Sequence, residues 1–92
     1  MIGSFKSKAL KRFWTKGEAR HLPDEHIDKI TQILDLLDAA VTPEEMNIPG
    51  LRFHGLSGNS KGRYAVKVSA NYRITFAFEG PDAIDINYED YH

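Results

Sequence analysis

The sequence predicts a single α+β domain in which two N-terminal helices pack on one face of an antiparallel β-sheet. Apolar residues recur with the period of a helix, about 3.6 residues, before residue 42, and with the two-residue period of a strand after residue 50. The change comes at Pro49 and Gly50, two residue types that interrupt regular structure. No repeat, low-complexity tract or long linker is present, so residues 1–92 are expected to form one domain.

Two helices are expected in the first half of the chain. Residues 7–16 are followed by Gly17, which suits the left-handed position after a helix. The apolar stripe of this helix consists of Leu10, Phe13 and Trp14. The second helix begins behind the Pro-Asp-Glu of residues 23–25. Its apolar stripe consists of Ile27, Ile30, Ile33, Leu34, Leu37 and Val41. Residues 42–45, Thr-Pro-Glu-Glu, form a capping box for a short helical turn, and residues 2–5 suit a short strand.

Four strands are expected in the second half, over residues 51–56, 63–68, 72–78 and 84–88. Residues 57–62 suit a flexible hairpin loop, and residues 80–82 suit a turn. Alternation assigns to the core face of these strands the residues Tyr64, Val66, Val68, Tyr72, Ile74, Phe76, Phe78, Ile84, Ile86 and Tyr88. The opposite face, open to water, is expected to carry His54, Arg63, Lys67 and Arg73.

The net charge of −1 conceals four segregated blocks of charge. Residues 1–17 carry five basic residues and no acid, residues 18–45 have a net charge of −6, residues 46–78 carry five basic residues and no acid, and residues 79–92 carry five acids without Lys or Arg. A ligand senses the field within about 8–10 Å, so the local sign of the charge matters more than the total. The third block suggests a surface that faces a polyanion, although strands that expose basic residues to water would give the same pattern.

The composition excludes several classes of protein. At 41% hydrophobic and 27% charged residues, the chain is typical of a globular domain and too apolar for a disordered one. No apolar run approaches the roughly 20 residues that span a bilayer, and the first residues lack the pattern of a secretory signal. Cysteine is absent, as are the HExxH, GxGxxG and P-loop motifs. We therefore expect a cytoplasmic protein with no cofactor and no membrane association.

Four histidines are the remaining candidates for chemistry. His21 and His26 stand beside Asp24 in a polar segment, where they are expected to be solvated surface groups. This triplet is a weak metal-binding pattern, and no metal site is expected.

His54 and His92 stand in more informative positions. His54 falls within a predicted strand, and His92 ends the chain after Asp90 and Tyr91. Two imidazoles beside several cations can cleave RNA without a metal: one activates a ribose 2′-OH, the cations stabilise the phosphorane, and the other protonates the 5′-oxygen. A hydrogen-bonded strand histidine and a frayed chain end would explain the same residues without catalysis.

Short segments spread along the chain carry a resemblance to a known family. They are Met1, Ile2, Ser4 and Phe5 before a helix with Lys and Leu; Pro49, Gly50, His54, Leu56 and Gly58; Asn71, Tyr72, Arg73, Ile74 and Phe76; and the closing Asp90, Tyr91 and His92. In this order and spacing, the sequence resembles the HigB-like (plasmid-killer type) toxins of the RelE/ParE superfamily over essentially its whole length.

The resemblance implies both a fold and a function. Members of the family are compact α+β domains with two N-terminal helices on an antiparallel sheet. They are bacterial type II toxins, typically mRNA endonucleases that depend on the ribosome and cut in its 30S A site. A HigA-type helix-turn-helix antitoxin neutralises them, and operator DNA is contacted only through that antitoxin.

Five residues of this sequence match the catalytic positions of the family. The resemblance implies that His54 and His92 act as general base and general acid, in an order that the sequence leaves open. It implies that Arg73 neutralises the scissile phosphate, that Asp90 orients a histidine or contacts the 2′-OH, and that Tyr91 stacks on a base.

Three basic residues are expected to bind flanking phosphates or ribosomal RNA: Lys61, Arg63 and Lys67. Two positions depart from the family pattern. Tyr72 stands where many members have Trp, which keeps an aromatic ring. Ser57 stands where a basic residue is common, so one phosphate contact is absent unless Lys61 supplies it.

Two other functions remain open. A non-enzymatic inhibitor of DNA gyrase, like the ParE branch, would use the same scaffold, but that branch generally lacks the histidine-rich set formed by His54 and residues 90–92. An inactive toxin retained as an antitoxin-binding co-repressor would keep the fold alone. The second helix is a candidate antitoxin surface, and the acidic segment 18–45 is expected to be a solvated helix face.

Overall fold

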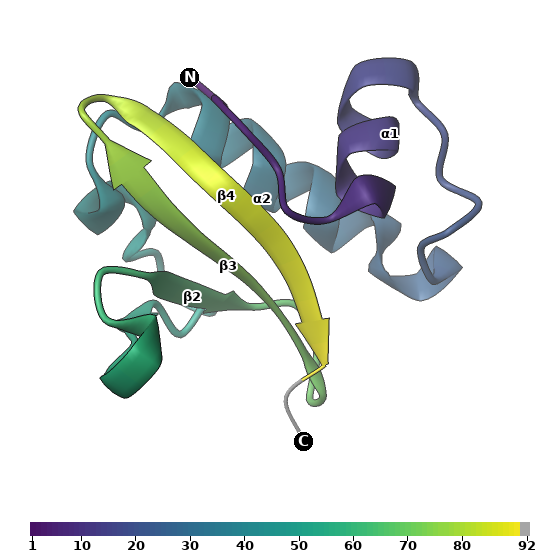
Figure 1. Ribbon diagram of the computed structural model, residues 1–92. Helices are drawn as coiled ribbons and strands as arrows, with labels where there is room; N and C mark the ends of the chain where they lie inside the picture. The colour runs from purple at the N-terminus through teal and green to yellow at the C-terminus, as the bar shows by residue number, and fades with distance from the viewer. Residues whose placement is uncertain (91–92) are drawn as a thin grey trace.

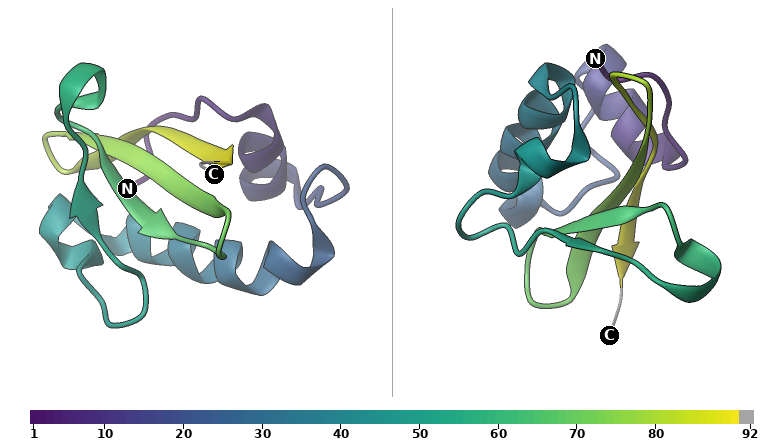
Figure 2. Two further views of the ribbon diagram at one scale, coloured as in Figure 1. Left: turned by 90° about the horizontal axis from the view of Figure 1, so that it is seen from below. Right: turned by 90° about the vertical axis from the view of Figure 1, so that its left-hand side faces the viewer.

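The computed structural model describes residues 1–90 and has the predicted α+β architecture. Four antiparallel strands form one sheet in the order β1-β2-β3-β4. Figures 1 and 2 show the helices gathered on one side of this sheet, so that its other face remains uncovered. The fold class is therefore confirmed.

The helices follow the predicted periodicity closely. Helix α1 spans Lys8–Lys16 and helix α2 spans Ile27–Ala39, with 3-10 turns at Asp24–His26, Pro43–Met46 and Gly58–Ser60. The hydroxyl of Ser7 caps α1 by accepting from the Leu10 N–H at 3.1 Å. Gly17 ends α1 at φ 72°, in the left-handed region that glycine tolerates best.

Helix α2 ends two residues before Val41, which was wrongly predicted to lie on its buried stripe. Val41 is 56% exposed. The capping box explains the early end, because the Glu45 carboxylate accepts from the backbone N–H groups of Val41 and Thr42 at 2.7 and 2.9 Å. Ala40 accordingly turns to an extended conformation at ψ 143°.

The strands are β1 His54–Gly55, β2 Tyr64–Lys67, β3 Tyr72–Glu79 and β4 Asp82–Asp90. The strand predicted over residues 51–56 is reduced to β1. Arg52 has φ 51°, which a strand cannot accommodate, and the chain joins the sheet only after it. Residues 2–5 make two isolated parallel bridges to β4 instead of a strand.

A β-bulge in β4 corrects one predicted core residue. Asp85 has φ 51°, and the register of β4 against β3 shifts between Thr75 and Ala77. As a result Ile84 pairs with Ala77 on the open face, whereas the sequence alternation placed it in the core. Ala83 is fully buried in its place, and Ile86 is fully buried as predicted.

The core lies between the helices and the covered face of the sheet. Its fully buried side chains come from both halves of the chain: Leu10, Ile30, Ile33, Leu34, Leu37, Met46, Val66, Ile74, Phe76, Ala83 and Ile86. This packing fixes the strands and so holds the polar side chains of the other face in a defined arrangement.

Candidate active site

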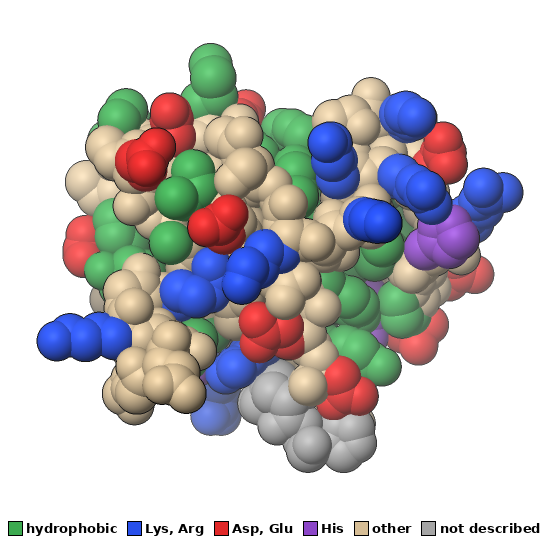
Figure 3. Space-filling model, viewed as in Figure 1, with side chains coloured by type: hydrophobic (Ala, Val, Ile, Leu, Met, Phe, Trp, Pro, Cys, Tyr) green, Lys and Arg blue, Asp and Glu red, His purple; other side chains and the backbone are tan. Residues whose placement is uncertain are grey.

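The candidate site is built on the uncovered face of the sheet. Residues directly opposite one another in an antiparallel pair share a face. Lys67 pairs with Arg73, and Arg73 pairs with Glu89, so all three lie on one face; His54 pairs with Ala65 on the same side. In Figure 3, basic side chains gather over the middle of the sheet beside acidic ones, and a separate basic group covers α1.

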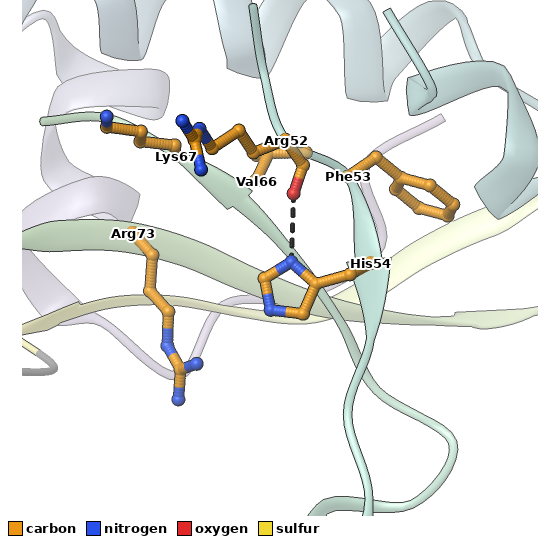
Figure 4. A pocket seen from close by; sticks show the side chains of 6 residues that line it. All are labelled: Arg52, Phe53, His54, Val66, Lys67 and Arg73. Atoms are coloured by element: carbon orange, nitrogen blue, oxygen red, sulfur yellow. Dashed lines mark hydrogen bonds between the residues drawn. The ribbon is translucent and has the colours of Figure 1, made fainter.

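A hollow of about 380 Å³ opens between β1, β2 and β3. It is lined by Arg52, Phe53, His54, Val66, Lys67 and Arg73. Figure 4 shows His54 and Arg73 facing each other across it, with Arg52 and Lys67 along its rim. The hollow thus unites three cations with one imidazole, a combination suited to a phosphate group.

The hydrogen bond of His54 determines which ring nitrogen can exchange a proton. Its Nδ1 lies 2.8 Å from the backbone oxygen of Arg52. A carbonyl oxygen only accepts, so Nδ1 carries the hydrogen and Nε2 is the atom that gains or loses a proton. The side chain of His54 is exposed, so a substrate can reach it.

The unusual backbone of Arg52 makes this hydrogen bond possible. Non-glycine residues with positive φ are uncommon and cluster at functional sites. At φ 51°, Arg52 presents its carbonyl to His54 and places its own side chain on the rim of the hollow. The sequence analysis did not assign Arg52 to the site, although its charge and its proximity to His54 were visible.

Arg73 is held by Glu89 from the neighbouring strand. The Nε and Nη2 groups of Arg73 donate to Oε1 of Glu89 at 3.2 and 3.1 Å. The two side chains are only 24% and 28% exposed, so this ion pair is partly withdrawn from solvent. Glu89 was also missed by the sequence analysis, because only the strand register reveals that it lies opposite Arg73.

Glu89 accepts further hydrogen bonds at its other oxygen. The hydroxyl of Thr75 donates to Oε2 at 2.7 Å, and Nδ2 of Asn87 donates to the same oxygen at 3.2 Å. Burial raises the pKa of Glu89, but the hydrogen bonds from Thr75, Arg73 and Asn87 outweigh it and leave the pKa below its ordinary value. Glu89 is therefore a carboxylate at neutral pH.

Arg63 lies on the same face but is engaged by its own sheet. Its Nη2 donates to the hydroxyl of Thr75 and to the backbone oxygen of Asp85, both at 2.8 Å. It therefore braces the bulge in β4 against β3. Of the other two residues predicted to contact RNA, Lys67 lines the hollow and Lys61 is exposed on the loop between β1 and β2.

Asp90 ends β4 opposite Tyr72, which places it on the helix-covered side of the sheet and not on the face of Arg73. The structure brings His54, Arg73 and Lys67 together around the hollow. Asp90 does not line the hollow and lies at the end of β4. Tyr91 and His92, the remaining predicted catalytic residues, lie outside the described residues.

His26 was predicted to be a solvated surface group, and this was wrong. It is 8% exposed, with Nδ1 2.5 Å from the hydroxyl of Tyr88 and its ring packed edge-on against Tyr72 at 5.2 Å. Tyr72 and Tyr88 stack at 5.1 Å. Burial, followed by the negative charge of Tyr72, Glu25 and Asp90, raises the pKa of Tyr88 to about 12. The polar sequence around His26 concealed this aromatic cluster, since its partners come from distant strands.

Within residues 1–90, no group of three His, Cys, Asp or Glu side chains is arranged to hold a metal ion. The described helices also include none long and apolar enough to cross a membrane.

Comparison with solved structures defines the class of protein. The fold matches YafQ from E. coli strain BL21(DE3), with a TM-score of 0.63, 14% identity and coverage of 98% of this chain and 93% of that one. It also matches the YoeB–YefM complex from Staphylococcus aureus, with a TM-score of 0.61, 15% identity and coverage of 100% and 98%. These two matches show that the chain shares the small α+β fold of YafQ and YoeB.

Sequence comparison identifies the family. Residues 3–92 match the family described as "RelE-like toxin of type II toxin-antitoxin system HigB". The chain is 41% identical over 92 residues to Endoribonuclease HigB of Proteus vulgaris, covering 100% of both chains. It is 35% identical over 96 residues to Toxin HigB-1 of Vibrio cholerae serotype O1, covering 100% of this chain and 98% of the relative. The protein belongs to the HigB-like toxin family of type II toxin-antitoxin systems.

Proposed function

We propose that this toxin is an endoribonuclease that cleaves mRNA on the ribosome by metal-independent attack of a ribose 2′-OH. The observation that carries the proposal is the hollow that unites His54 with Arg52, Lys67 and Arg73. It occurs in a chain that is 41% identical, over its full length, to a relative named as an endoribonuclease.

In the proposed reaction, a general base removes the proton from the 2′-OH, the 2′-oxygen bonds to phosphorus, and the bond from phosphorus to the 5′-oxygen breaks. The leaving oxygen receives a proton from a general acid, so the products carry a 2′,3′-cyclic phosphate and a 5′-OH. His54, acting through Nε2, and His92 supply these two functions in either order. Arg73 neutralises the charge that develops on the phosphate.

The other proposed roles belong to the end of β4 and to the basic residues around the hollow. Asp90 would orient a histidine or contact the 2′-OH, and Tyr91 would stack on a base. Lys67, on the edge of the hollow, and the exposed Lys61 would bind flanking phosphates. Arg63 would contribute to RNA binding through donors other than the Nη2 group that braces the sheet.

The partners follow from this function. Family membership implies an antitoxin, for which we propose a HigA-type helix-turn-helix protein that alone contacts operator DNA. The exposed side of α2 is our candidate for its binding surface. The 30S A site with its mRNA is the proposed site of action, which places the working toxin in the cytoplasm.

The test is expression of the toxin without antitoxin, followed by mapping of the new RNA 5′ ends. We expect growth arrest and cuts within translated mRNA. Arg73→Ala and His92→Gln should relieve the growth arrest and reduce cleavage to a low residual rate, whereas Lys29→Gln, which removes a charge from α2, should change neither effect. If the Arg73 and His92 variants fold and remain fully toxic, the assigned site is wrong.

A second assay separates the two alternative functions. Inhibition of gyrase supercoiling by the purified toxin, without mRNA cleavage, would establish the ParE-like alternative. A folded wild-type protein that neither cleaves mRNA nor inhibits gyrase, yet binds its antitoxin, would establish the inactive co-repressor.

A further inference from the structure

Glu89 occupies the centre of the polar network on the open face. Its carboxylate accepts four hydrogen bonds: two from Arg73 at Oε1, and one each from Thr75 and Asn87 at Oε2. An ionised carboxylate offers about four acceptor positions, so these bonds use its full capacity. Its lowered pKa also makes it a poor proton acceptor. Glu89 is therefore equipped to hold its neighbours and not to exchange protons.

The hydrogen bonds fix the plane of the Arg73 guanidinium. Nε and Nη2 lie on the same edge of this planar group, and both donate to a single oxygen of Glu89. A guanidinium held along one edge keeps its whole fork in a defined orientation. Arg73 also lines the hollow, so the orientation imposed by Glu89 is the one that a phosphate in the hollow would meet.

Glu89 is itself held from the opposite side. The hydroxyl of Thr75 is fully buried, donates to Glu89 at 2.7 Å and accepts from Arg63 at 2.8 Å. Arg63 also binds the backbone oxygen of Asp85 on β4. A chain of hydrogen bonds thus runs from Arg63, just before β2, through Thr75 on β3 and Glu89 on β4 to Arg73 on β3.

We infer that Glu89 is a positioning residue, which orients Arg73 for the phosphate of the bound RNA. The inference rests on the proposed function, because that function assigns Arg73 to the phosphate. It has a characteristic consequence: a carboxylate on a face that receives RNA weakens binding by repulsion, while the orientation it provides speeds the chemical step. Removal of its charge should therefore slow the chemical step without weakening the binding of RNA.

Glu89→Gln is the variant that tests this expectation. The amide preserves the shape of the side chain but places an N–H donor where Arg73 or Thr75 also donates. In cleavage of mRNA on programmed ribosomes, we expect kcat to fall by about 10- to 100-fold and KM to fall or stay unchanged. A variant with wild-type kcat, or one whose loss is confined to a raised KM, would overturn the inference.

A double-mutant cycle shows whether the effect passes through Arg73. With Arg73→Ala already present, Glu89→Gln should change kcat by less than about twofold. Equal losses in both backgrounds would mean that Glu89 acts independently of Arg73, which contradicts the inference. Wild-type cleavage by Arg73→Ala would refute the proposed function, whereas a strongly impaired Arg73→Ala beside a fully active Glu89→Gln would refute only the positioning role.

Thr75 provides a matched pair of variants in case Glu89→Gln does not fold. Thr75→Ser keeps the hydroxyl that bonds Glu89, and Thr75→Val removes it at nearly constant volume. We expect Thr75→Ser to retain kcat within about threefold and Thr75→Val to lose about tenfold or more. Equal rates for the two folded variants would contradict the inference that the network orients Arg73.

Discussion

Replacement of Arg63 distinguishes a structural brace from an RNA contact. The sequence analysis assigned Arg63 to phosphate binding, yet its Nη2 donates two hydrogen bonds of 2.8 Å within the sheet. A hydrogen bond that involves a charged group stabilises a protein by about 1.5–3 kcal/mol. Arg63 is only half-buried, and in the unfolded chain its donors bond to water instead, so the loss should be smaller than the sum for two such bonds. We expect Arg63→Ala to lower the free energy of unfolding by about 2 kcal/mol.

Thermal unfolding of the RNA-free toxin measures this cost. In a domain of 92 residues, about 1 kcal/mol corresponds to roughly 4–8 °C in Tm, so Arg63→Ala should lower Tm by about 8–16 °C. Arg63→Lys retains the charge but not the planar fork, and should recover only part of the loss. Lys61→Ala, on an exposed loop, should change stability by less than about 0.5 kcal/mol.

The comparison with RNA binding can refute this reasoning. If Arg63→Ala melts like the wild type but binds RNA weakly, Arg63 is an RNA contact and the bridge from Thr75 to Asp85 contributes little to stability. If Arg63→Lys restores RNA affinity while Tm stays low, the brace and the contact are separate properties of one side chain.

Three other predictions follow from the same structure. Affinity for single-stranded RNA falls with salt, and Lys67→Gln should make the slope of log affinity against log salt shallower by about 0.7. Lys29→Gln should leave this slope unchanged, as titration at several salt concentrations would show. The folded pKa of Tyr88 lies above its unfolded value of 10.0, so the folded state favours the neutral phenol and stability should fall between pH 10 and about 12. Denaturant unfolding across this range should show a smaller fall for Tyr88→Phe, which also deprives buried His26 of its partner at a cost of about 1 kcal/mol. The pKa of Glu89 is lowered by folding, so its contribution is present above the unfolded value of 4.5 and is lost as the pH falls through the folded value; Glu89→Gln should flatten this acid limb of the stability profile.

The fold was largely predictable because hydrophobic periodicity determines it. The apolar stripes of α1 and α2 and the alternation in β2 and β3 lie where the sequence placed them, apart from Val41. The errors in β1 and β4 occur at Arg52 and Asp85, two non-glycine residues at φ 51°. Arg is not a residue type that favours positive φ, and although Asp tolerates it better than most residues, the alternating pattern around Asp85 gives no sign of a bulge. Their conformations depend on tertiary contacts. At Asp85, for example, the backbone N–H donates to the hydroxyl of Ser4 and the backbone carbonyl accepts from Arg63.

The candidate site was less predictable from the sequence than the fold. Family resemblance selected His54 and Arg73, and the structure places both on one hollow. The support around them was not visible, because Glu89 becomes the partner of Arg73 and Thr75 only through strand register. His26 was misjudged for a related reason: its polar neighbours in the sequence suggested exposure, while Tyr72 and Tyr88 bury it from β3 and β4.

The position of Glu89 also links the support of the hollow to the end of the chain. Glu89 directly precedes Asp90, Tyr91 and His92, the residues to which the proposed mechanism assigns catalytic roles. A slip of one residue in the register of β4 would exchange its two faces, so it would remove Glu89 from Arg73 and place its carboxylate on the covered side. The ion pair between Glu89 and Arg73 therefore opposes such a slip. The pairing that orients the guanidinium is, for this reason, also the pairing that holds Asp90 opposite Tyr72 at the end of β4.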